Sequence, residues 1–212
     1  MVRSETSSEG LVTISFTISL DRPDKANALT PGMLEALIAA VEAATTAGAR
    51  ALVLTGTGKV FSAGADLDAA RAGLAVSPLW EALSGAIAAA PALTIAALNG
   101  TAAGGALGMV LACDLRIAVP SAKIFYPVMR LGFLPQPSDP RRLAALAGPS
   151  RAAMILMAGQ KITADEALSW GLIDRIVEPE ALAETAAALA ADALAAEVAH
   201  VAGIKRLIAA AR

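Results

Sequence analysis

Several residue types on which functional sites commonly depend are nearly missing from this sequence. One cysteine, Cys113, excludes a disulfide framework, and its apolar surroundings favour a packing role. One histidine, His200, does not readily supply a multi-histidine metal site or a Ser-His-Asp triad, and we interpret it as an exposed helix-surface residue. Four Phe, two Trp and one Tyr are too few for a platform on which nucleic-acid bases stack. We therefore expect neither a metal nor a nucleic-acid partner.

Long apolar runs are also missing, although 56% of the residues are hydrophobic and the mean hydropathy is +0.61. The excess is alanine, and the best candidate for a membrane span, residues 82–98, contains Ser84 and Pro91. The formal net charge is −2, without a cluster of Lys or Arg on one helix face. The first nine residues lack the apolar stretch of a secretion signal. We expect a cytoplasmic protein with no membrane partner.

Predicted strands and helices alternate, which indicates a layered α/β fold. A length of 212 residues suits one domain with a sizeable core. Apolar patterning predicts strands over residues 11–20, 51–54, 94–98 and 114–119. Helices are expected over residues 31–48, 78–90, 103–113, 140–147, 149–158, 163–170, 179–195 and 197–210. Strands thus concentrate in the first part, and the last 70 residues are nearly all helical.

Two segments about forty residues apart, 60–67 and 98–108, place small residues where an apolar strand gives way to a turn. Without a Cβ atom, such a turn lets a ligand approach backbone N–H groups closely. The second segment also runs into a predicted helix, whose start carries a partial positive charge. Two such turns facing one another would bind a carbonyl oxygen and stabilise it as an oxyanion. The alternative is that Gly104-Gly105 only allows tight packing of a helix on a strand.

Two other motifs are interpreted as structural. Residues 56–59 follow a strand as a phosphate-binding loop does, but Val60 stands where that loop needs Ser or Thr after Lys59. Ser62 lacks the preceding glycine that a nucleophile elbow requires. A tight turn and a packing serine are the simpler interpretations.

The small-residue segments belong to a longer pattern that extends over most of the chain. It includes Asp21-Arg-Pro-Asp-Lys-Ala-Asn-Ala-Leu29, Phe61-Ser-Ala-Gly-Ala-Asp-Leu67, Gly104-Gly105, Leu111-Ala-Cys-Asp-Leu-Arg-Ile-Ala118 and Gly171-Leu-Ile-Asp-Arg-Ile-Val177. In this order the segments resemble the crotonase (enoyl-CoA hydratase/isomerase) superfamily. The resemblance implies an α/β, ClpP/crotonase-like spiral of ββα units over residues 1–177. A C-terminal helical segment, shortened relative to the family, is expected over residues 178–212.

The resemblance also implies a site. The backbone N–H groups of Ala63 and Gly105 would form an oxyanion hole for an acyl-CoA thioester, and CoA itself would be part of the substrate rather than a separate cofactor. The residues expected to contact substrate or CoA are Lys25, Ala26, Ala63, Gly64, Ala65, Asp66, Leu67, Gly104 and Gly105. Family members form trimers, and an apolar cluster in the helical part favours a homotrimer or hexamer here. That cluster comprises Leu143, Leu146, Met154, Ile155, Leu156 and Met157.

The chain departs from the family at its acid–base positions. The two glutamates that hydratases use to activate water and deliver a proton fall on Gly108 and Val128. Conventional hydratase activity is therefore expected to be weak or absent. Glu81 and Asp139 are candidates for an alternative acid or base, and Tyr126 is a weaker one. For Glu81 the simpler interpretation is a solvent-facing position in the first helical turn, and for Asp139 it is helix N-capping.

Two functions remain in competition at this stage. The first is an enzyme that stabilises a thioester enolate or oxyanion, with Glu81 or Asp139 as acid–base group. The second is a non-catalytic fatty-acyl-CoA-binding protein that retains the oxyanion hole. A ClpP-like serine protease is disfavoured, because the turn at residues 104–106 has no serine and His200 is remote. Neither the acyl group nor the reaction type (hydration, isomerisation, hydrolysis or decarboxylation) follows from the sequence.

Overall fold

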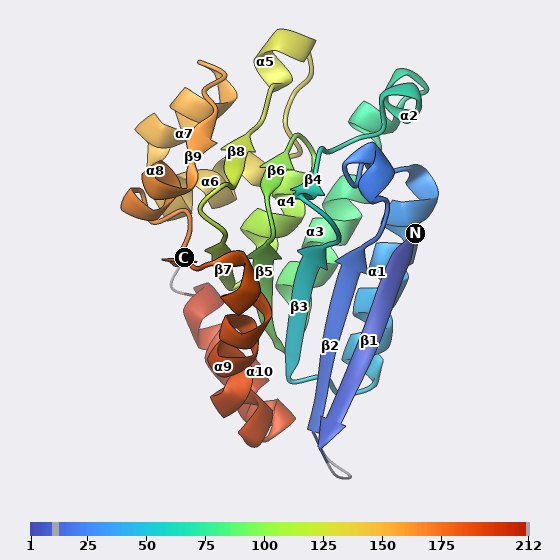
Figure 1. Cartoon of the computed structure of the whole chain (residues 1–212), viewed down its shortest axis with the longest axis vertical. Coiled ribbons are helices and arrows are strands. Elements are labelled where there is room, and N and C mark those ends of the chain that lie inside the picture. The colour runs from blue at the N-terminus through green and yellow to red at the C-terminus, as the bar shows by residue number, and fades with distance from the viewer. Residues whose placement is uncertain (10–12, 211–212) are drawn as a thin grey trace.

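The computed structural model describes residues 1–9 and 13–210 and contains two β-sheets with helices packed around them (Figure 1). The larger sheet has six strands in the order β1-β2-β3-β5-β7-β10. Strands β1 (Val2–Glu9) and β2 (Thr13–Leu20) are antiparallel, and the remaining pairs are parallel. The parallel strands are β3 (Ala51–Gly56), β5 (Leu93–Leu98), β7 (Leu115–Ala118) and β10 (Arg175–Ile176).

The smaller sheet is built from strands that come directly after strands of the larger sheet in the sequence. Three of its four strands follow β3, β5 and β7. Its order is β4 (Val60–Ser62), β6 (Thr101–Ala103), β8 (Lys123–Phe125) and β9 (Ile162–Thr163). Helices α3 (Leu79–Ala89), α4 (Ala106–Ala112) and α6 (Asp139–Ala147) come after β4, β6 and β8 in turn. This repeated strand–strand–helix order confirms the predicted spiral of ββα units. Figure 1 shows the small sheet beyond the upper ends of β3 and β5.

Helices cover both faces of the large sheet. Helix α1 (Pro31–Thr46) begins where predicted, with the Thr30 side chain accepting a hydrogen bond from Met33 N, and it packs with α3. Helix α9 (Leu182–Ala195) packs on the other face, against β2, β3 and β5. Successive strand side chains point to opposite faces, so Thr17 and Val53 face α9 while Ile18 and Leu54 are buried on the α1 and α3 side.

The predicted elements are confirmed to within a few residues, except that residues 11 and 12 of the first strand lie outside the described residues. Helices α7 (Pro149–Leu156), α8 (Ala164–Ser169) and α10 (Val198–Ala210) match their predictions. Strand β1 was not predicted, because its residues are polar on both faces of an edge strand. The sequence analysis also missed the elements that are only two to five residues long, because so short a segment shows no hydrophobic period. These are the strands of the second sheet, strand β10 of the first sheet, and helices α2 (Leu67–Arg71) and α5 (Val128–Leu131). The domain boundary at residue 177 stays a prediction.

No single helix within the described ranges is long and apolar enough to cross a membrane. The segments 179–195 and 198–210 reach that length and composition only together, and they bend by 110° at their break.

The apolar cluster behind the predicted assembly is partly covered by the chain itself. Leu143 and Ile155 are fully buried and Leu156 is 9% exposed, whereas Met154 and Met157 are 42% and 65% exposed. The homotrimer or hexamer therefore stays a prediction that rests on a smaller exposed surface than the sequence indicated.

Light scattering is expected to give about 64 kDa for a trimer, three times the 21.3 kDa chain mass, or twice that mass for a hexamer. A 21.3 kDa species at micromolar concentration would contradict it.

Asparagine side chains hold together the turns that carry the chain from the large sheet into the small one. Asn99 accepts a hydrogen bond from Gly56 N (3.1 Å) and donates to the carbonyl oxygens of Gly58 (2.9 Å) and Val60 (3.3 Å). Asn27, fully buried, donates to Val60 O from the other side (2.7 Å). These bonds fix the turn at residues 56–60 against the turn at residues 99–100.

We expect Gly100→Ala to destabilise the fold, because a methyl group at this position would collide with the carbonyl of Lys59. Overpacking of this kind typically costs about 1–3 kcal/mol. Chemical denaturation should show this loss in the free energy of unfolding. The matched control is Gly85→Ala in α3, where nothing lies within 4 Å of the new methyl group and replacing a helical glycine typically gains about 1 kcal/mol. Equal stability of the two variants would contradict the close packing of the turns.

Candidate active site

Two loops, which begin at the carboxyl ends of β4 and β6, meet beside the small sheet. Gly64 has φ +91°, and a methyl group added to it would lie 2.7 Å from Ala103 O and 3.3 Å from Gly104 Cα. Only glycine combines this left-handed backbone with so close an approach. Two residues before it, Ser62 is fully buried, donates to Asn27 O (2.8 Å) and accepts from Gly64 N (3.1 Å), which confirms its structural interpretation.

The hydrogen bonds of these loops leave two backbone N–H groups unpaired. Around the first, Leu29 N donates to Gly64 O and Asp66 N donates to Leu29 O, so the intervening N–H of Ala65 takes no part in the pairing. Around the second, Gly104 N donates to Phe125 O, and Gly105 stands at the start of α4. Throughout the described ranges, neither Ala65 N nor Gly105 N has a hydrogen-bond acceptor.

Ala63 differs from its predicted role. Its N–H already donates to Ala26 O at 2.9 Å, so it is used by the fold and does not offer a free donor to a ligand. The sequence assignment of one oxyanion donor to Ala63 is corrected on this ground. The free N–H lies two residues further on, at Ala65.

Ala65 and Gly105 line the same cavity of about 290 Å³. Its inner wall contains the buried side chains of Trp80, Tyr126 and Val128, and its rim contains the exposed Leu131 and Leu134. The remaining lining residues are Ala63, Leu67, Ala70, Ala75, Gly104, Pro127, Arg130, Phe133 and Gln136. A concave, mostly apolar pocket with a few convergent polar groups is the usual form of a small-molecule site.

The predicted CoA-contacting residues divide into two groups. Ala63, Ala65, Leu67, Gly104 and Gly105 line the cavity, whereas Lys25, Ala26, Gly64 and Asp66 do not.

Asp66 instead organises the loop. Its carboxylate forms an ion pair with Arg22 (2.7 Å) and accepts from the N–H groups of Asp68 and Ala69 as the N-cap of α2. The hydrogen bond from Arg22 lowers the pKa of Asp66 most strongly. Lys25 and Ala26 belong to a 3-10 turn at residues 23–26.

Asp139 is a buried carboxylic acid directly behind the cavity wall. It is 1% exposed, its Oδ2 accepts a hydrogen bond from the Tyr126 hydroxyl (3.1 Å), and its Oδ1 has no partner among the described residues. Burial is the main cause that raises the pKa of Asp139 to about 6. Burial and the nearby Asp139 charge also raise the pKa of Tyr126, which keeps the phenol protonated. The N-capping interpretation is wrong, because Ser138 is the N-cap and no side chain caps α6.

Gly108 gives Asp139 the space it occupies. A methyl group on Gly108 would lie 2.9 Å from Asp139 Oδ1 and 3.2 Å from Oδ2. A glutamate at position 108 of α4 would thus compete with Asp139 for the same volume. Asp139, on α6, places its carboxyl group in the space that such a glutamate would need.

Glu81 lies in the first turn of α3, as predicted, but does not simply face solvent. Its Oε2 accepts hydrogen bonds from Ser138 N (3.2 Å) and Ser138 Oγ (3.0 Å), and the side chain does not line the cavity. Glu81 therefore fixes the start of α6, next to Asp139.

Sequence reasoning missed Trp80 and Phe133 as cavity residues and ranked Tyr126 low. A signal was available in composition: three of the seven aromatic residues, Trp80, Tyr126 and Phe133, line this one cavity. Their convergence from three separate segments is visible only in the fold.

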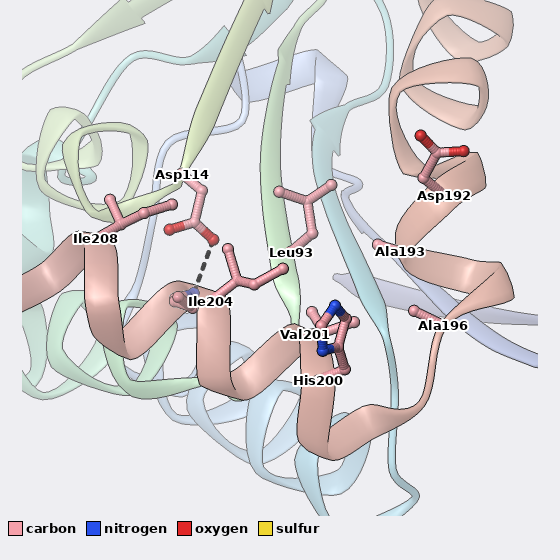
Figure 2. Close-up of a pocket in the computed structure, with 10 residues that line it drawn as sticks. Leu93, Asp114, Asp192, Ala193, Ala196, His200, Val201, Ile204 and Ile208 are labelled. Atoms are coloured by element: carbon pink, nitrogen blue, oxygen red, sulfur yellow. Dashed lines mark ion pairs between the residues drawn. The ribbon is translucent and has the colours of Figure 1, made fainter.

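A second cavity, of about 380 Å³, lies between α9, α10 and the start of β5 (Figure 2). Its walls are mainly Leu93, Val201, Ile204 and Ile208, and the ion pair of Asp114 with Lys205 (2.8 Å) closes one side. His200 is exposed there, as predicted. None of the predicted site residues lines this cavity, and its two ion-paired groups satisfy one another, so we do not assign chemistry to it.

Cys113 has the predicted packing role. It is 1% exposed, its thiol donates to Met109 O (3.3 Å), and burial raises the pKa of the thiol to about 12. It is therefore not a nucleophile at neutral pH.

The buried acid makes a prediction for stability. Because the pKa of Asp139 is about 6 in the folded protein, against an ordinary value of 3.8, the folded form holds this proton more tightly than the unfolded chain does. Its contribution is fully present below pH 3.8 and is lost as the pH rises through about 6. The loss is about 3 kcal/mol. Asp139→Asn should remove this decline in a series of denaturation curves from pH 4 to 8, while Asp68→Asn, at a 91% exposed side chain, should keep it. If stability declines with pH in Asp139→Asn as it does in the unmodified protein, the buried Asp139 carboxylate is not the cause of the decline.

Comparison with known proteins agrees with this fold. The chain is similar to the probable enoyl-CoA hydratase echA6 of Mycobacterium tuberculosis (37% identical over 161 residues, 76% of this chain and 66% of the relative). It is also similar to the 1,2-epoxyphenylacetyl-CoA isomerase of Escherichia coli (34% over 187 residues, 82% and 71%). Among solved structures, an enoyl-CoA hydratase from Bacillus anthracis superposes with a TM-score of 0.86 at 32% identity, over 96% of this chain and 82% of the other.

The matched stretch spans about two thirds (66%) of the length of the Mycobacterium relative. The family model described as enoyl-CoA hydratase/isomerase matches residues 13–211. With this match and the shared topology, the chain belongs to the enoyl-CoA hydratase/isomerase family of the crotonase superfamily.

Proposed function

We propose that this protein is an acyl-CoA enzyme that binds the thioester carbonyl oxygen between the N–H groups of Ala65 and Gly105. The observation that carries the proposal is that these two N–H groups lack acceptors among the described residues and line one cavity. Donors fixed by the fold stabilise negative charge on a carbonyl oxygen without reorganising during the reaction. The family relationship supports a thioester as the ligand, with CoA as part of the substrate and no separate cofactor.

The acid–base group in this proposal is the pair of Tyr126 and Asp139. Tyr126 lines the cavity and donates to Asp139, and burial raises the pKa of Asp139 to about 6. When a substrate C–H bond next to the carbonyl ionises, its proton passes to the Tyr126 oxygen as the phenolic proton moves to Asp139. The electron pair remains on the substrate as an enolate, whose oxygen is held by Ala65 and Gly105. Glu81 positions Asp139 through Ser138.

Conventional hydration is expected to be weak under this proposal. Gly108 and Val128 offer no carboxylate to activate water, and Asp139 lies behind Tyr126 rather than on the cavity surface. Reactions in which one acid–base pair removes a proton from the carbon beside the carbonyl and returns it to another carbon, such as isomerisation, are favoured over addition of water.

A second candidate is a non-catalytic fatty-acyl-CoA-binding protein. One observation favours it: the described residues that line the cavity include no carboxylate, and their ionisable side chains are those of Tyr126 and Arg130. The two candidates differ in whether bound acyl-CoA undergoes proton exchange.

The oxyanion site is tested by Ala65→Pro, which removes one N–H group that the loop does not use. A hydrogen bond typically contributes about 0.5–1.5 kcal/mol, so affinity for butyryl-CoA should fall roughly twofold to tenfold. The infrared carbonyl stretch of bound thioester should also return toward its free frequency. Ala65→Gly keeps the N–H and should preserve both. If the carbonyl stretch is the same in Ala65→Pro and the unmodified protein, Ala65 is not a donor.

The proposed proton transfer is tested by deuterium exchange into butyryl-CoA in heavy water, followed by mass spectrometry. The unmodified protein should exchange the hydrogens beside the carbonyl, at a rate that rises with pH through about 6 as Asp139 loses its proton. Asp139→Asn and Tyr126→Phe should each lose about 10²–10⁴-fold. Binding without exchange in the unmodified protein would instead support the second candidate. Exchange that survives Asp139→Asn would show that another group is the base.

A further inference from the structure

The inner wall of the cavity is aromatic in a chain that has few aromatic residues. Trp80 and Tyr126 are each 4% exposed and lie at the inner end, next to Gly105 and Val128. Phe133, 40% exposed, adds a third ring at the rim. Aromatic residues make up only 3% of the sequence, yet three of the seven aromatic side chains line this one small cavity. An even distribution of aromatic residues over the chain would not place so many of them together.

Both inner rings are held in place by their polar atoms. Trp80 Nε1 donates to Leu74 O at 2.7 Å, and the Tyr126 hydroxyl donates to Asp139 at 3.1 Å. Since each side chain is anchored at its polar end, the ring orientation is fixed before a ligand binds. The wall is therefore pre-organised, and binding does not have to order it at a cost in entropy.

Trp80 packs against Gly105, one of the two proposed donors. A methyl group on Gly105 would lie 3.0 Å from the indole atoms Cδ2 and Cε3. Gly105 and Trp80 also line the same cavity, so an acyl group whose carbonyl oxygen binds at Gly105 N shares that cavity with the indole.

We propose that the preferred acyl group is an arylacetyl group, in which one CH₂ joins the aromatic ring to the thioester carbonyl and keeps the C–H bond that the proposed reaction ionises; this inference rests on the proposed function. Aromatic pairs gain free energy beyond their buried area when rings are offset or edge-to-face. The cavity of about 290 Å³ has room for the ring, since a cavity of about 150 Å³ holds benzene. A saturated chain gains no such term and loses more rotational freedom on binding.

The test compares two ligands that have the same number of ring carbons, phenylacetyl-CoA and cyclohexylacetyl-CoA, by calorimetry with the full chain. Phenylacetyl-CoA should bind about tenfold more tightly. Trp80→Leu should bring the ratio of the two dissociation constants close to one, and Trp80→Phe should retain most of it. Leu207→Ala, at a 75% exposed position of α10 that does not line the cavity, should leave the ratio unchanged. Because the ligand ratio in the unmodified protein decides the matter, the test does not depend on how well Trp80→Leu folds.

The outcomes separate the two proposals. Equal binding of both ligands, tighter binding of cyclohexylacetyl-CoA, or tighter binding of octanoyl-CoA than of either would overturn the aryl preference while leaving the acyl-CoA site intact. If phenylacetyl-, cyclohexylacetyl-, butyryl- and octanoyl-CoA all fail to bind, the proposed function itself is wrong and the aryl preference fails with it.

Discussion

The contact between Gly64 and the backbone of Ala103 and Gly104 is the constraint on which the rest of the site depends. It brings a loop of one ββα unit against the corresponding loop of the next unit, without a side chain between them. The pairing of that loop with Leu29 uses the groups on either side of Ala65 and leaves the Ala65 N–H unpaired among the described residues. The start of α4 leaves the Gly105 N–H unpaired in the same cavity. Backbone geometry, rather than reactive side chains, thus defines this site.

The proposed acid–base group depends on burial and on the packing of α6 against α4. Position 108 on α4 has no side chain, and Asp139 on α6 occupies the space beside it, with one oxygen unpaired within the described part of the chain. Burial raises the pKa of Asp139 to about 6, which costs stability at higher pH because the charged form is poorly solvated. Tyr126 links the acid to the cavity, and Glu81 holds the helix start that presents it.

Local signals in the sequence were sufficient for most of the fold, whereas the two proposed donors came from the resemblance to the family. The cap at Thr30 and the apolar periods of the long helices act over a few residues, so they predicted those elements well. The oxyanion role of Gly105, which the resemblance implied, stays a prediction. Ala63 was chosen instead of Ala65 because the direction of each N–H depends on pairing with Ala26 and Leu29, which are distant in sequence. The contact of Asp139 with Gly108, and of Trp80 with Gly105, likewise exists only once the helices pack.

The central claim is that a thioester oxygen is held by the N–H groups of Ala65 and Gly105. It is tested most directly by backbone amide NMR during titration with a non-hydrolysable analogue of acyl-CoA in which a methylene group replaces the thioester sulfur. The account predicts that the amide protons of Ala65 and Gly105 move downfield on saturation, while that of Ala63, already bonded to Ala26, stays in place. Saturable binding with no shift at Ala65 and Gly105, or with shifts confined to residues around Lys205, would contradict it.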